Sequence, residues 1–353
     1  MAQRFDTLAA FLAHGYDDVI DVRSPSEYTE DHVPGAISLP VLDDAQRAQV
    51  GTLYKADAFS AKITGAALVA RNAAAHLEAA LAGKPGGWRP LVYCWRGGQR
   101  SGSFATILQQ IGWRADVIEG GYRSYRRLVA QAMYDAPLRH RLIVLEGHTG
   151  TAKTDVLQRL RARGTQVLDL EGLANHRGSV FGAMQGGQPS QKAFEGALAS
   201  AVLQLDPTRA VVLEAESSKI GNLLIPPAIW KPMLVAPRIR ITASLSARAR
   251  YLAAAYADIV SDAEVLHGIL DTLVQFQGKE RVGHWHELAD QGAFEALACE
   301  LMEYHYDPRY SKSGERDETD HLGDVVTDAL TPEALDGVAG KVAGLVEQVP
   351  LAK

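Results

Sequence analysis

The chain of 353 residues contains only two cysteines, Cys94 and Cys299. Two cysteines cannot form a disulfide framework, and the Cys-x-x-Cys and histidine spacings of a zinc site do not occur, so we predict no metal site. No apolar run approaches the roughly 18 residues of a membrane span. The first residues, MAQRFDTLAAFLAHGYDDVIDV, lack the basic start, apolar block and small-residue cleavage site of a secretion signal. We therefore expect a cytoplasmic protein in a reducing environment, without a membrane partner.

Positive charge is not in excess: 42 acidic residues outnumber 36 basic ones, which gives a net charge of −6 at pH 7. This balance argues against indiscriminate binding of nucleic acid. Between Pro85 and Arg127, however, the sequence holds seven arginines and only two acidic residues. Such a stretch can bind a polyanion, or it can be an ordinary solvated surface, and charge alone does not decide between the two.

Short apolar runs alternate with longer helical patterns, which is typical of an α/β fold. In the first part of the chain the expected strands are 17–22, 90–94 and 115–121. A helix is expected over 101–112, ending at Gly112. In the second part the expected strands are 141–147, 166–172, 209–217 and 237–244, before a largely helical region. Since a domain has about 150 residues, we predict two: a first domain over 1–135 and a second over 136–353.

The segment YCWRGGQRSG, residues 93–102, places Cys94 after an expected strand and before an expected helix. Backbone N–H groups and the helix dipole favour an anion there, so the pKa of Cys94 should fall below the free value of about 8.5. The segment therefore suits a nucleophilic sulfur that attacks a phosphate or carries a sulfur or selenium atom. Its candidate anion-binding residues are Trp95, Arg96, Gly97, Gly98, Arg100 and Ser101.

The spacing from Cys94 to Arg100 is compatible with two enzyme classes. C-x5-R occurs in cysteine-dependent phosphatases, but these usually have a histidine where this chain has Tyr93. The upstream segment DVRSPSEYTEDHVPGAISLP (21–40) instead resembles the first signature of the rhodanese family, and EGGYRSYRR (119–127) resembles its last part. The resemblance implies a rhodanese-like first domain in which Asp21 and Arg23 have a structural role.

The segment GHTGTAKT, residues 147–154, follows an expected strand and opens an expected helix, as a P-loop does. Its candidate phosphate ligands are Gly147, Gly150, Lys153 and Thr154. Ala152 stands where the pattern G-x-x-x-x-G-K-[ST] has glycine, and we expect its methyl group to crowd the phosphate cradle. This argues against ordinary binding of ATP or GTP, and more strongly against their hydrolysis, while a phosphate or diphosphate group is still the expected occupant.

Two further segments follow expected strands of the second domain, at the edge where open α/β sheets bind ligands. DLEGLANHRGSVFG (169–182) supplies three more candidate phosphate ligands: His176, Arg177 and Ser179. VVLEAES (211–217) ends in Glu214 and Glu216, which are candidate acids or, through water, candidate partners of Mg²⁺. Surface residues at strand ends would look the same.

Together these segments closely resemble the bacterial tRNA 2-selenouridine synthase family, in which a rhodanese domain is fused to a P-loop domain. The motifs that carry the resemblance are DVRSPSEY, YCWRGGQRS, EGGYRSYRR, GHTGTAKT, DLEGLANHRGS, QPSQKAFE, ESSKIG and YHYDPRY. The chain departs from the family pattern at Ala152 and at Gln99, where methionine is expected.

The resemblance implies a transferase that acts on the wobble uridine of tRNA. The family first transfers a geranyl group from geranyl diphosphate to the sulfur of 2-thiouridine. It then replaces the geranylated sulfur by selenium from selenophosphate. Cys94 would carry the selenium, the P-loop would hold the diphosphate, and no cofactor would be tightly bound. The candidate tRNA-binding residues are Arg123, Arg126 and Arg127.

Two alternatives remain open at this point. One is a sulfurtransferase or cysteine phosphatase fused to a nucleotide-binding domain; the other is a binding module with a vestigial rhodanese fold, against which the intact Cys94 argues. Outside the motifs, Cys299 is expected in the core of an apolar helix. His284, Trp285 and His286 are expected to stack on RNA or to lie in an exposed loop.

Overall fold

A computed structural model describes residues 1–311 and 321–349 of the chain. The contacts divide it into two units, and the division is not a single cut. The first unit comprises Met1–Pro137 and Pro189–Leu203, and the second comprises Leu138–Gln188 and Gln204–Lys353. The two predicted domains, 1–135 and 136–353, are each continuous in sequence. The prediction therefore does not include the assignment of Pro189–Leu203 to the first unit.

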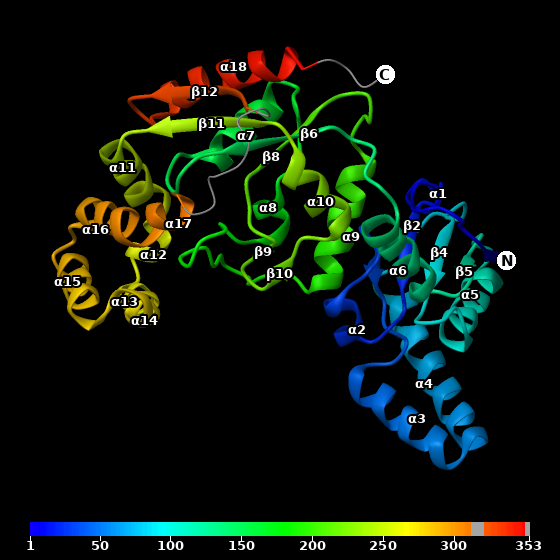
Figure 1. Cartoon of the computed structure of the whole chain (residues 1–353). Coiled ribbons are helices and arrows are strands. Elements are labelled where there is room, and N and C mark those ends of the chain that lie inside the picture. The colour runs from blue at the N-terminus through cyan, green and yellow to red at the C-terminus, as the bar shows by residue number, and fades with distance from the viewer. Residues whose placement is uncertain (312–320, 350–353) are drawn as a thin grey trace. The chain divides into compact units, whose positions relative to one another are not determined.

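The first unit is built on a five-stranded sheet in which every pair of neighbouring strands is parallel. In spatial order its strands are β1 (Ala2–Gln3), β5 (Asp116–Ile118), β4 (Pro90–Tyr93), β2 (Asp18–Asp21) and β3 (Ile37–Ser38); three of them, β2, β4 and β5, are labelled in Figure 1. The strands expected near 17–22, 90–94 and 115–121 are confirmed, whereas the two-residue edge strands β1 and β3 were not predicted. Because β4 lies in the middle and is fully buried, its carboxyl end brings Cys94 to the centre of the sheet edge.

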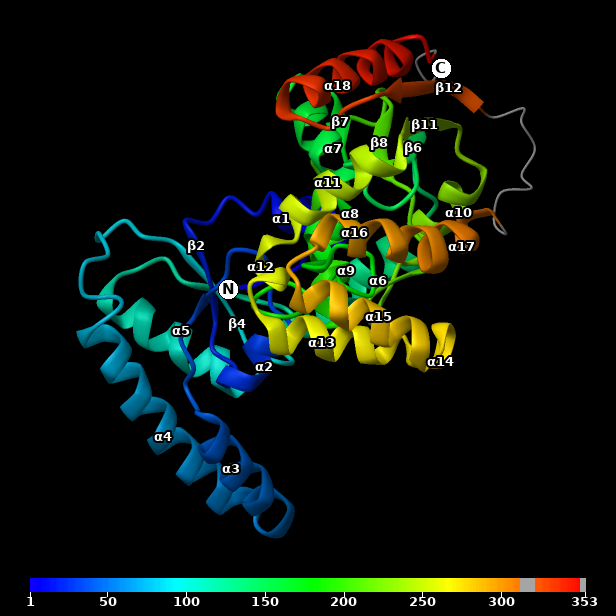
Figure 2. The same ribbon diagram turned by 90° about the vertical axis from the view of Figure 1, so that its left-hand side faces the viewer.

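Helices cover this sheet and extend beyond it. They are α1 (Leu8–Leu12), α2 (Pro25–Glu30), α3 (Asp44–Ala56), α4 (Ala58–Glu78), α5 (Gln99–Ile111), α6 (Tyr122–Ala130), the π-helix η1 (Gln131–Asp135) and α9 (Gln191–Leu203). The helix expected over 101–112 is α5, and Gly112 ends it with φ of 107° as predicted. The packed α3–α4 hairpin, which Figure 2 shows extending away from the sheet, was not predicted. Carboxylates of Asp43 and Asp57 cap the two helices of the hairpin.

The second unit also contains a parallel five-stranded sheet. In spatial order its strands are β12 (His321–Thr327), β11 (Arg238–Ala243), β6 (Leu142–Glu146), β8 (Val211–Glu214) and β7 (Gln166–Val167). The expected strand over 166–172 is shorter than predicted, because the carboxylate of Asp169 accepts a hydrogen bond from the Gly172 N–H (2.7 Å) and starts a helix. Strand β12 was not predicted.

The other elements of the second unit are mainly helices. They are α7 (Lys153–Ala162), α8 (Leu170–Ala174), α10 (Pro227–Val235), α11 (Leu245–Ala255), α12 (Ala257–Val260), α13 (Ala263–Thr272), α14 (Val274–Gln277), α15 (Lys279–Asp290), α16 (Phe294–Glu300), the π-helix η2 (Leu301–Tyr306), α17 (Asp307–Ser311) and α18 (Pro332–Glu347), with a hairpin of β9 (Lys219–Ile220) and β10 (Leu223–Leu224). The helical region expected after 244 is confirmed up to α17. Among the described residues, no helix is both long and apolar enough to cross a lipid bilayer.

Candidate functional site

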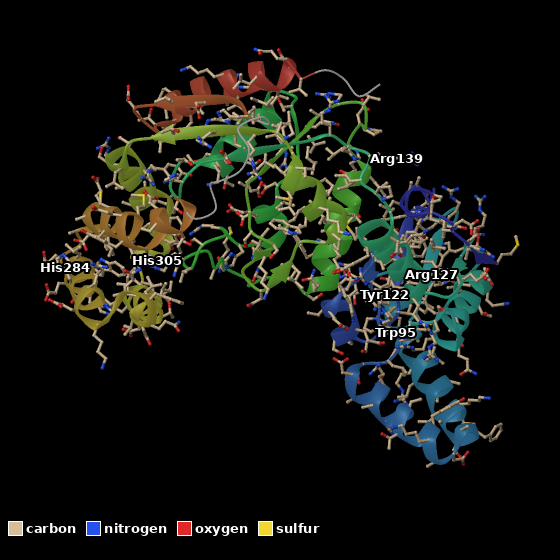
Figure 3. All side chains as sticks on the ribbon, in the orientation of Figure 1. Trp95, Tyr122, Arg127, Arg139, His284 and His305 are labelled. Carbon is tan, nitrogen blue, oxygen red and sulfur yellow. The ribbon has the colours of Figure 1, made fainter. Side chains whose placement is uncertain are left out.

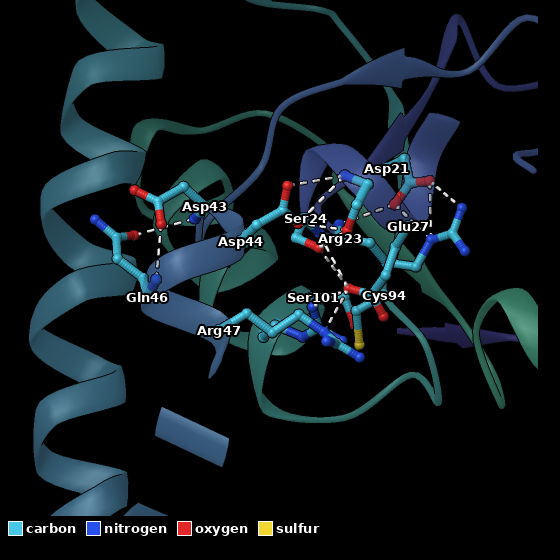
Figure 4. Close-up of polar contacts among 12 residues, drawn as sticks. Asp21, Arg23, Ser24, Glu27, Asp43, Asp44, Gln46, Arg47, Cys94 and Ser101 are labelled. Carbon is cyan, nitrogen blue, oxygen red and sulfur yellow. Dashed lines mark hydrogen bonds and ion pairs between the residues drawn. The ribbon is translucent and has the colours of Figure 1, made fainter. Parts of the chain in front are cut away.

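Cys94 lies directly after β4, is 3% exposed, and faces the first turn of α5 (Figure 4). Its sulfur accepts hydrogen bonds from the Ser101 hydroxyl (3.2 Å) and from the Gly98 N–H (3.3 Å). Burial opposes ionisation, but these hydrogen bonds and the charge of Arg100 outweigh it and lower the pKa of the Cys94 thiol below its ordinary value. The predicted direction of this pKa shift is confirmed, and the loop is suited to hold a negative charge on sulfur.

The glycine pair after β5 packs closely against the backbone of the Cys94 loop. Gly121 has a φ of 60°, and a Cβ atom there would lie 2.2 Å from the carbonyl oxygen of Cys94 and 2.5 Å from the Gly97 nitrogen. The next N–H groups, of Tyr122 and Arg123, donate to the carbonyl oxygens of Cys94 (2.8 Å) and Trp95 (3.2 Å). The motif EGGYRSYRR therefore shapes the Cys94 loop by close backbone packing, which only glycine allows.

Arg100 does not face the sulfur as an unpaired cation. Its guanidinium donates to Glu27 at 2.9 Å, and Arg47 lies 3.1 Å from the same carboxylate oxygen. Glu27 is 7% exposed; burial opposes its ionisation, but Arg100 and Arg47 together with the Ser24 N–H lower its pKa overall. Sequence reasoning missed Glu27, although SPSE is the pattern of a helix-capping box. Arg96, by contrast, is exposed and makes no hydrogen bond or ion pair with any residue that the structure describes.

Asp21 and Arg23 form a buried ion pair beneath the loop, at 2.6 Å. Arg23 also donates to the carbonyl oxygen of Asp31 (2.6 Å), and its Cζ lies 4.1 Å from the centre of the Tyr122 ring. Trp95 stacks on Tyr122 with ring centres 5.2 Å apart, and both are labelled in Figure 3. The structural role predicted for Asp21 and Arg23 is confirmed: their buried ion pair packs beneath the Cys94 loop and supports it.

In the second unit, the segment GHTGTAKT joins β6 to α7 in the strand–turn–helix arrangement of a P-loop. The Lys153 ammonium donates to the Gly147 carbonyl oxygen (2.8 Å), and the Thr154 hydroxyl donates to Glu171 (2.8 Å). Gly150 has φ of 83°, and a Cβ atom there would lie 2.9 Å from the Leu252 side chain. The four predicted phosphate ligands are thus brought together at the N-terminus of α7, where backbone N–H groups attract an anion.

Ala152 adopts the left-handed conformation that glycine usually supplies, with φ of 59° and ψ of 33°. Its side chain is 4% exposed and packs in the hydrophobic core of the sheet with Val156, Leu160 and Ile241. The methyl group therefore packs in the core, although Ala152 also lines the cleft, and we expect it to leave room for a phosphate. The substitution costs backbone strain, on the order of 1–2 kcal/mol, and leaves the turn of the loop intact.

Carboxyl groups gather beside Lys153. The Glu214 carboxylate is 1% exposed and accepts a hydrogen bond from the Glu171 N–H at 2.6 Å. Burial and then the charge of Asp169 raise the pKa of Glu214 to about 8. Burial and the neighbouring Glu171 raise the pKa of Glu216 to about 9, against the opposing charge of Lys153. The two acids predicted at the end of β8 thus hold protons near neutral pH.

These acids do not make a metal site by themselves. Within residues 1–311 and 321–349, no group of three or more His, Cys, Asp or Glu side chains has the arrangement to hold a metal ion. The Thr154 hydroxyl and Glu171 nevertheless present oxygen atoms at the edge of the loop. Mg²⁺ commonly binds through one or two such groups and completes its coordination with water and substrate phosphates.

The segment 169–182 lines the same cleft as the P-loop. Nδ1 of His176 accepts a hydrogen bond from the Gly178 N–H (3.1 Å), and burial lowers the pKa of His176, so the ring is neutral at pH 7. Arg177 is bidentate to Asp258 (3.0 and 3.1 Å) and lies over the Tyr256 ring, and the Ser179 hydroxyl lies 3.3 Å from the Tyr256 hydroxyl. The structure therefore brings the three residues to the phosphate cleft, but it pairs Arg177 and Ser179 with protein groups.

Comparison with known proteins follows the same two-unit division. The protein-family model of the rhodanese-like domain matches residues 5–128. The protein-family model of the tRNA 2-selenouridine synthase AAA domain matches residues 140–279. A tRNA 2-selenouridine synthase of Chromohalobacter salexigens is 33% identical over 342 residues, which are 87% of this chain and 91% of that protein. The chain belongs to the tRNA 2-selenouridine synthase family.

Other members of the family give the same picture. The tRNA 2-selenouridine synthase of Shewanella loihica is 34% identical over 331 residues, 92% of this chain and 82% of the relative. That of Hahella chejuensis is 35% identical over 257 residues, 70% of this chain and 65% of the relative. The predicted fold class, a rhodanese-like domain joined to a P-loop α/β domain, is confirmed for this selenouridine synthase family member.

The basic residues after the glycine pair differ in their surroundings. Arg123 and Arg127 are exposed, and Figure 3 labels Arg127. Arg126, also predicted to bind tRNA, is instead in an ion pair with the buried carboxylate of Glu195 in α9. Glu195 belongs to QPSQKAFE, so this motif of the synthase family has a structural function in the first unit: it anchors α9 to α6.

A buried arginine supports the P-loop of this synthase family member and was missed by sequence reasoning. Arg248 in α11 is 6% exposed and donates to the Thr149 carbonyl oxygen (3.2 Å) and, with both terminal nitrogens, to Asp307 (3.0 and 2.8 Å). Asp307 also lies 3.0 Å from Nδ1 of His148. The only sequence signal was Asp307 within the family motif YHYDPRY; the side chain of Tyr310 in that motif lies outside the described residues.

The remaining expectations concern the helical region. Cys299 in α16 is partly buried and packs against the small core of Ala249, Ala298 and Met302. Trp285 is not in an exposed loop: it lies within α15, is completely buried and donates to Glu300 at 2.9 Å. The expectation that it stacks on RNA or lies in an exposed loop is therefore wrong.

Proposed function

We propose that this chain modifies the wobble uridine of tRNA, converting 2-thiouridine to 2-selenouridine in two steps. The observation that carries the proposal is the presence, in one chain, of a hydrogen-bonded, acidified cysteine in a glycine-rich loop and of a P-loop suited to phosphate groups. Two sites of this kind match a reaction that both releases a diphosphate and transfers an atom held as an anion.

The P-loop serves the first step, in which the thiouridine sulfur attacks the first carbon of geranyl diphosphate and inorganic diphosphate departs. Lys153 and the N-terminus of α7 offer positive charge where the departing oxygens gain negative charge. Nothing in this step requires hydrolysis of a nucleotide, so the strained Ala152 is compatible with it. Alkylation also makes the sulfur a better leaving group for the second step.

Cys94 serves the second step, in which selenium from selenophosphate replaces the geranylated sulfur. The contacts that favour a thiolate at Cys94, namely the Ser101 hydroxyl, the Gly98 N–H and the charge of Arg100, would equally favour a selenium anion beside it. Water cleaves the P–Se bond of selenophosphate to give phosphate, the selenium anion attacks C2 of the uridine, and the C–S bond breaks so that geranyl thiolate leaves. Arg96 is exposed next to this loop and can contact the phosphate of selenophosphate.

Mg²⁺ would enter with the diphosphate and not as a resident cofactor. Thr154 and Glu171 would hold it, and it would neutralise part of the diphosphate charge. Arg123 and Arg127 are exposed cations of the basic stretch and would contact the tRNA backbone. Arg126, the third candidate, forms an ion pair with Glu195.

The test is conversion of a defined tRNA. Purified protein is incubated with tRNA bearing 2-thiouridine, geranyl diphosphate and selenophosphate, and the digested nucleosides are identified by mass spectrometry. We expect 2-selenouridine only when both co-substrates are present. Unchanged tRNA together with rapid turnover of thiosulfate would instead identify a plain sulfurtransferase.

A further inference from the structure

An apolar pocket lies in the second unit beside the P-loop. Its cavity volume is about 70 Å³, so a hydrocarbon chain would have to widen it on binding. Its walls come from α11, α12, α13, α16 and η2, and include Leu266, Leu297 and Met302, which are 3%, 3% and 0% exposed. Few polar atoms face the pocket, so water forms few hydrogen bonds there. Moving a hydrocarbon chain from solvent into the pocket is therefore favourable.

The pocket adjoins the phosphate cleft. Five residues line both: Thr149, Ser179, Leu252, Tyr256 and Tyr306. Thr149 belongs to the P-loop itself, and its carbonyl oxygen is fixed by Arg248. One ligand can therefore place an anionic head on the N-terminus of α7 and an apolar tail among the helices.

The junction offers little for a polar tail to bind. The hydroxyls of Ser179 and Tyr256 lie 3.3 Å apart, within hydrogen-bond range of each other. Arg177, which lies 4.8 Å above the Tyr256 ring, is neutralised by its two contacts with Asp258. A sugar or base beyond the phosphates would find few partners here, whereas an isoprenoid chain needs none.

We infer that this pocket binds the geranyl chain while the P-loop binds the diphosphate, and that its far wall selects the length of the chain. The inference rests on the proposed use of geranyl diphosphate and specifies where its hydrocarbon part lies. Phe294, half-buried at the start of α16, lines the pocket away from the P-loop cleft. Phe294→Ala should therefore enlarge the pocket and improve binding of the longer farnesyl diphosphate relative to geranyl diphosphate.

Helix α11 supplies a matched pair of variants. Ala253 lines the pocket and is half-buried, whereas its neighbour Ala254 is exposed and does not line it. Ala253→Phe places a ring where the chain would lie, and Ala254→Phe adds the same ring at the helix surface. Neither residue contacts the diphosphate in the proposed arrangement. The far-ultraviolet circular dichroism and melting temperature of both variants report whether the fold is kept.

The experiment is calorimetric titration of the full chain with two probes, inorganic diphosphate and geranyl S-thiolodiphosphate, each in Mg²⁺. We expect wild type and Ala254→Phe to bind the geranyl probe at least about tenfold more tightly than diphosphate. Ala253→Phe should lose this advantage while keeping its affinity for diphosphate. Should Ala253→Phe, folded, retain the full geranyl advantage, the pocket assignment is overturned while the proposed function stands. If wild type binds neither probe, the proposed use of geranyl diphosphate fails, and the inference fails with it.

Discussion

The hydroxyl of Ser101, itself completely buried, lies 3.2 Å from the sulfur of Cys94. This hydrogen bond favours the thiolate, so Ser101→Ala should raise the pKa of Cys94 towards its ordinary value. The rate of alkylation by iodoacetamide as a function of pH measures this pKa. Ser103→Ala is the control, because Ser103 lies on the same helix but is exposed. Equal pKa values in Ser101→Ala and wild type would show that the hydroxyl does not stabilise the thiolate.

Arg248 should be essential for the stability of the P-loop. Arg248→Met removes the bond to the Thr149 carbonyl and leaves the partly buried Asp307 without its main partner, so the free energy of unfolding should fall by about 3 kcal/mol. Urea unfolding followed by circular dichroism measures the loss. Arg250→Met, an exposed arginine on the same helix, should change stability by less than about 0.5 kcal/mol. Similar losses in the two variants would refute the role of Arg248.

Glu214 should make stability depend on pH. Its pKa is raised by burial and Asp169 from an ordinary value of 4.5 to about 8 in the folded chain. Between these values the folded state holds a proton that the unfolded state releases, so the free energy of unfolding falls as pH rises through this window. Below about 4.5 both states are protonated, and the contribution is constant.

The free energy of unfolding, measured in EDTA at pH values from about 5 to about 9, tests this dependence. Glu214→Gln should remove a large part of the decline, because glutamine does not ionise but can still accept the hydrogen bond from the Glu171 N–H. Glu264→Gln, an exposed acid, should keep the wild-type dependence. A Glu214→Gln profile that is parallel to wild type would mean that Glu214 is already ionised in the folded chain.

Ala152→Gly should be tolerated. It relieves the left-handed backbone strain of about 1–2 kcal/mol and removes a buried methyl group that contributes about 0.8 kcal/mol, so stability should change by less than about 1 kcal/mol. The affinity for inorganic diphosphate should stay within about threefold of wild type, because the methyl group packs in the core. A large gain in affinity for diphosphate would instead show that the Ala152 methyl group crowds the phosphate-binding site.

The two ligand-binding loops could be predicted because their information is local. Cys94 and the P-loop each follow an apolar strand and precede a helix, and glycines mark the turns. The direction of the Cys94 pKa shift follows from this context alone. The core packing of Ala152 could not be predicted, because the sequence gives the side chain but not its direction, which depends on the left-handed backbone.

What could not be predicted depends on contacts between distant residues. Glu195 joins the first unit through Arg126 and Tyr134, which lie 69 and 61 positions earlier in the chain. Arg248 meets Asp307 across 59 positions and Thr149 across 99. Trp285 was expected to stack on RNA or to lie in an exposed loop, because its polar neighbours His284 and His286 hide the helical spacing of Val282 and Trp285, the buried residues of α15. No local pattern specifies such pairings.

The central claim is that the P-loop and Cys94 serve successive steps, and complementary variants test it most directly. Nucleosides are analysed by mass spectrometry after reaction of 2-thiouridine tRNA, or of tRNA geranylated beforehand, with Cys94→Ser and Lys153→Ala proteins. The account predicts that Cys94→Ser accumulates geranyl-thiouridine without selenouridine. Lys153→Ala should leave 2-thiouridine unchanged but should convert geranylated tRNA to selenouridine. Selenouridine formation by Cys94→Ser at the wild-type rate, or failure of Lys153→Ala on geranylated tRNA, would contradict it.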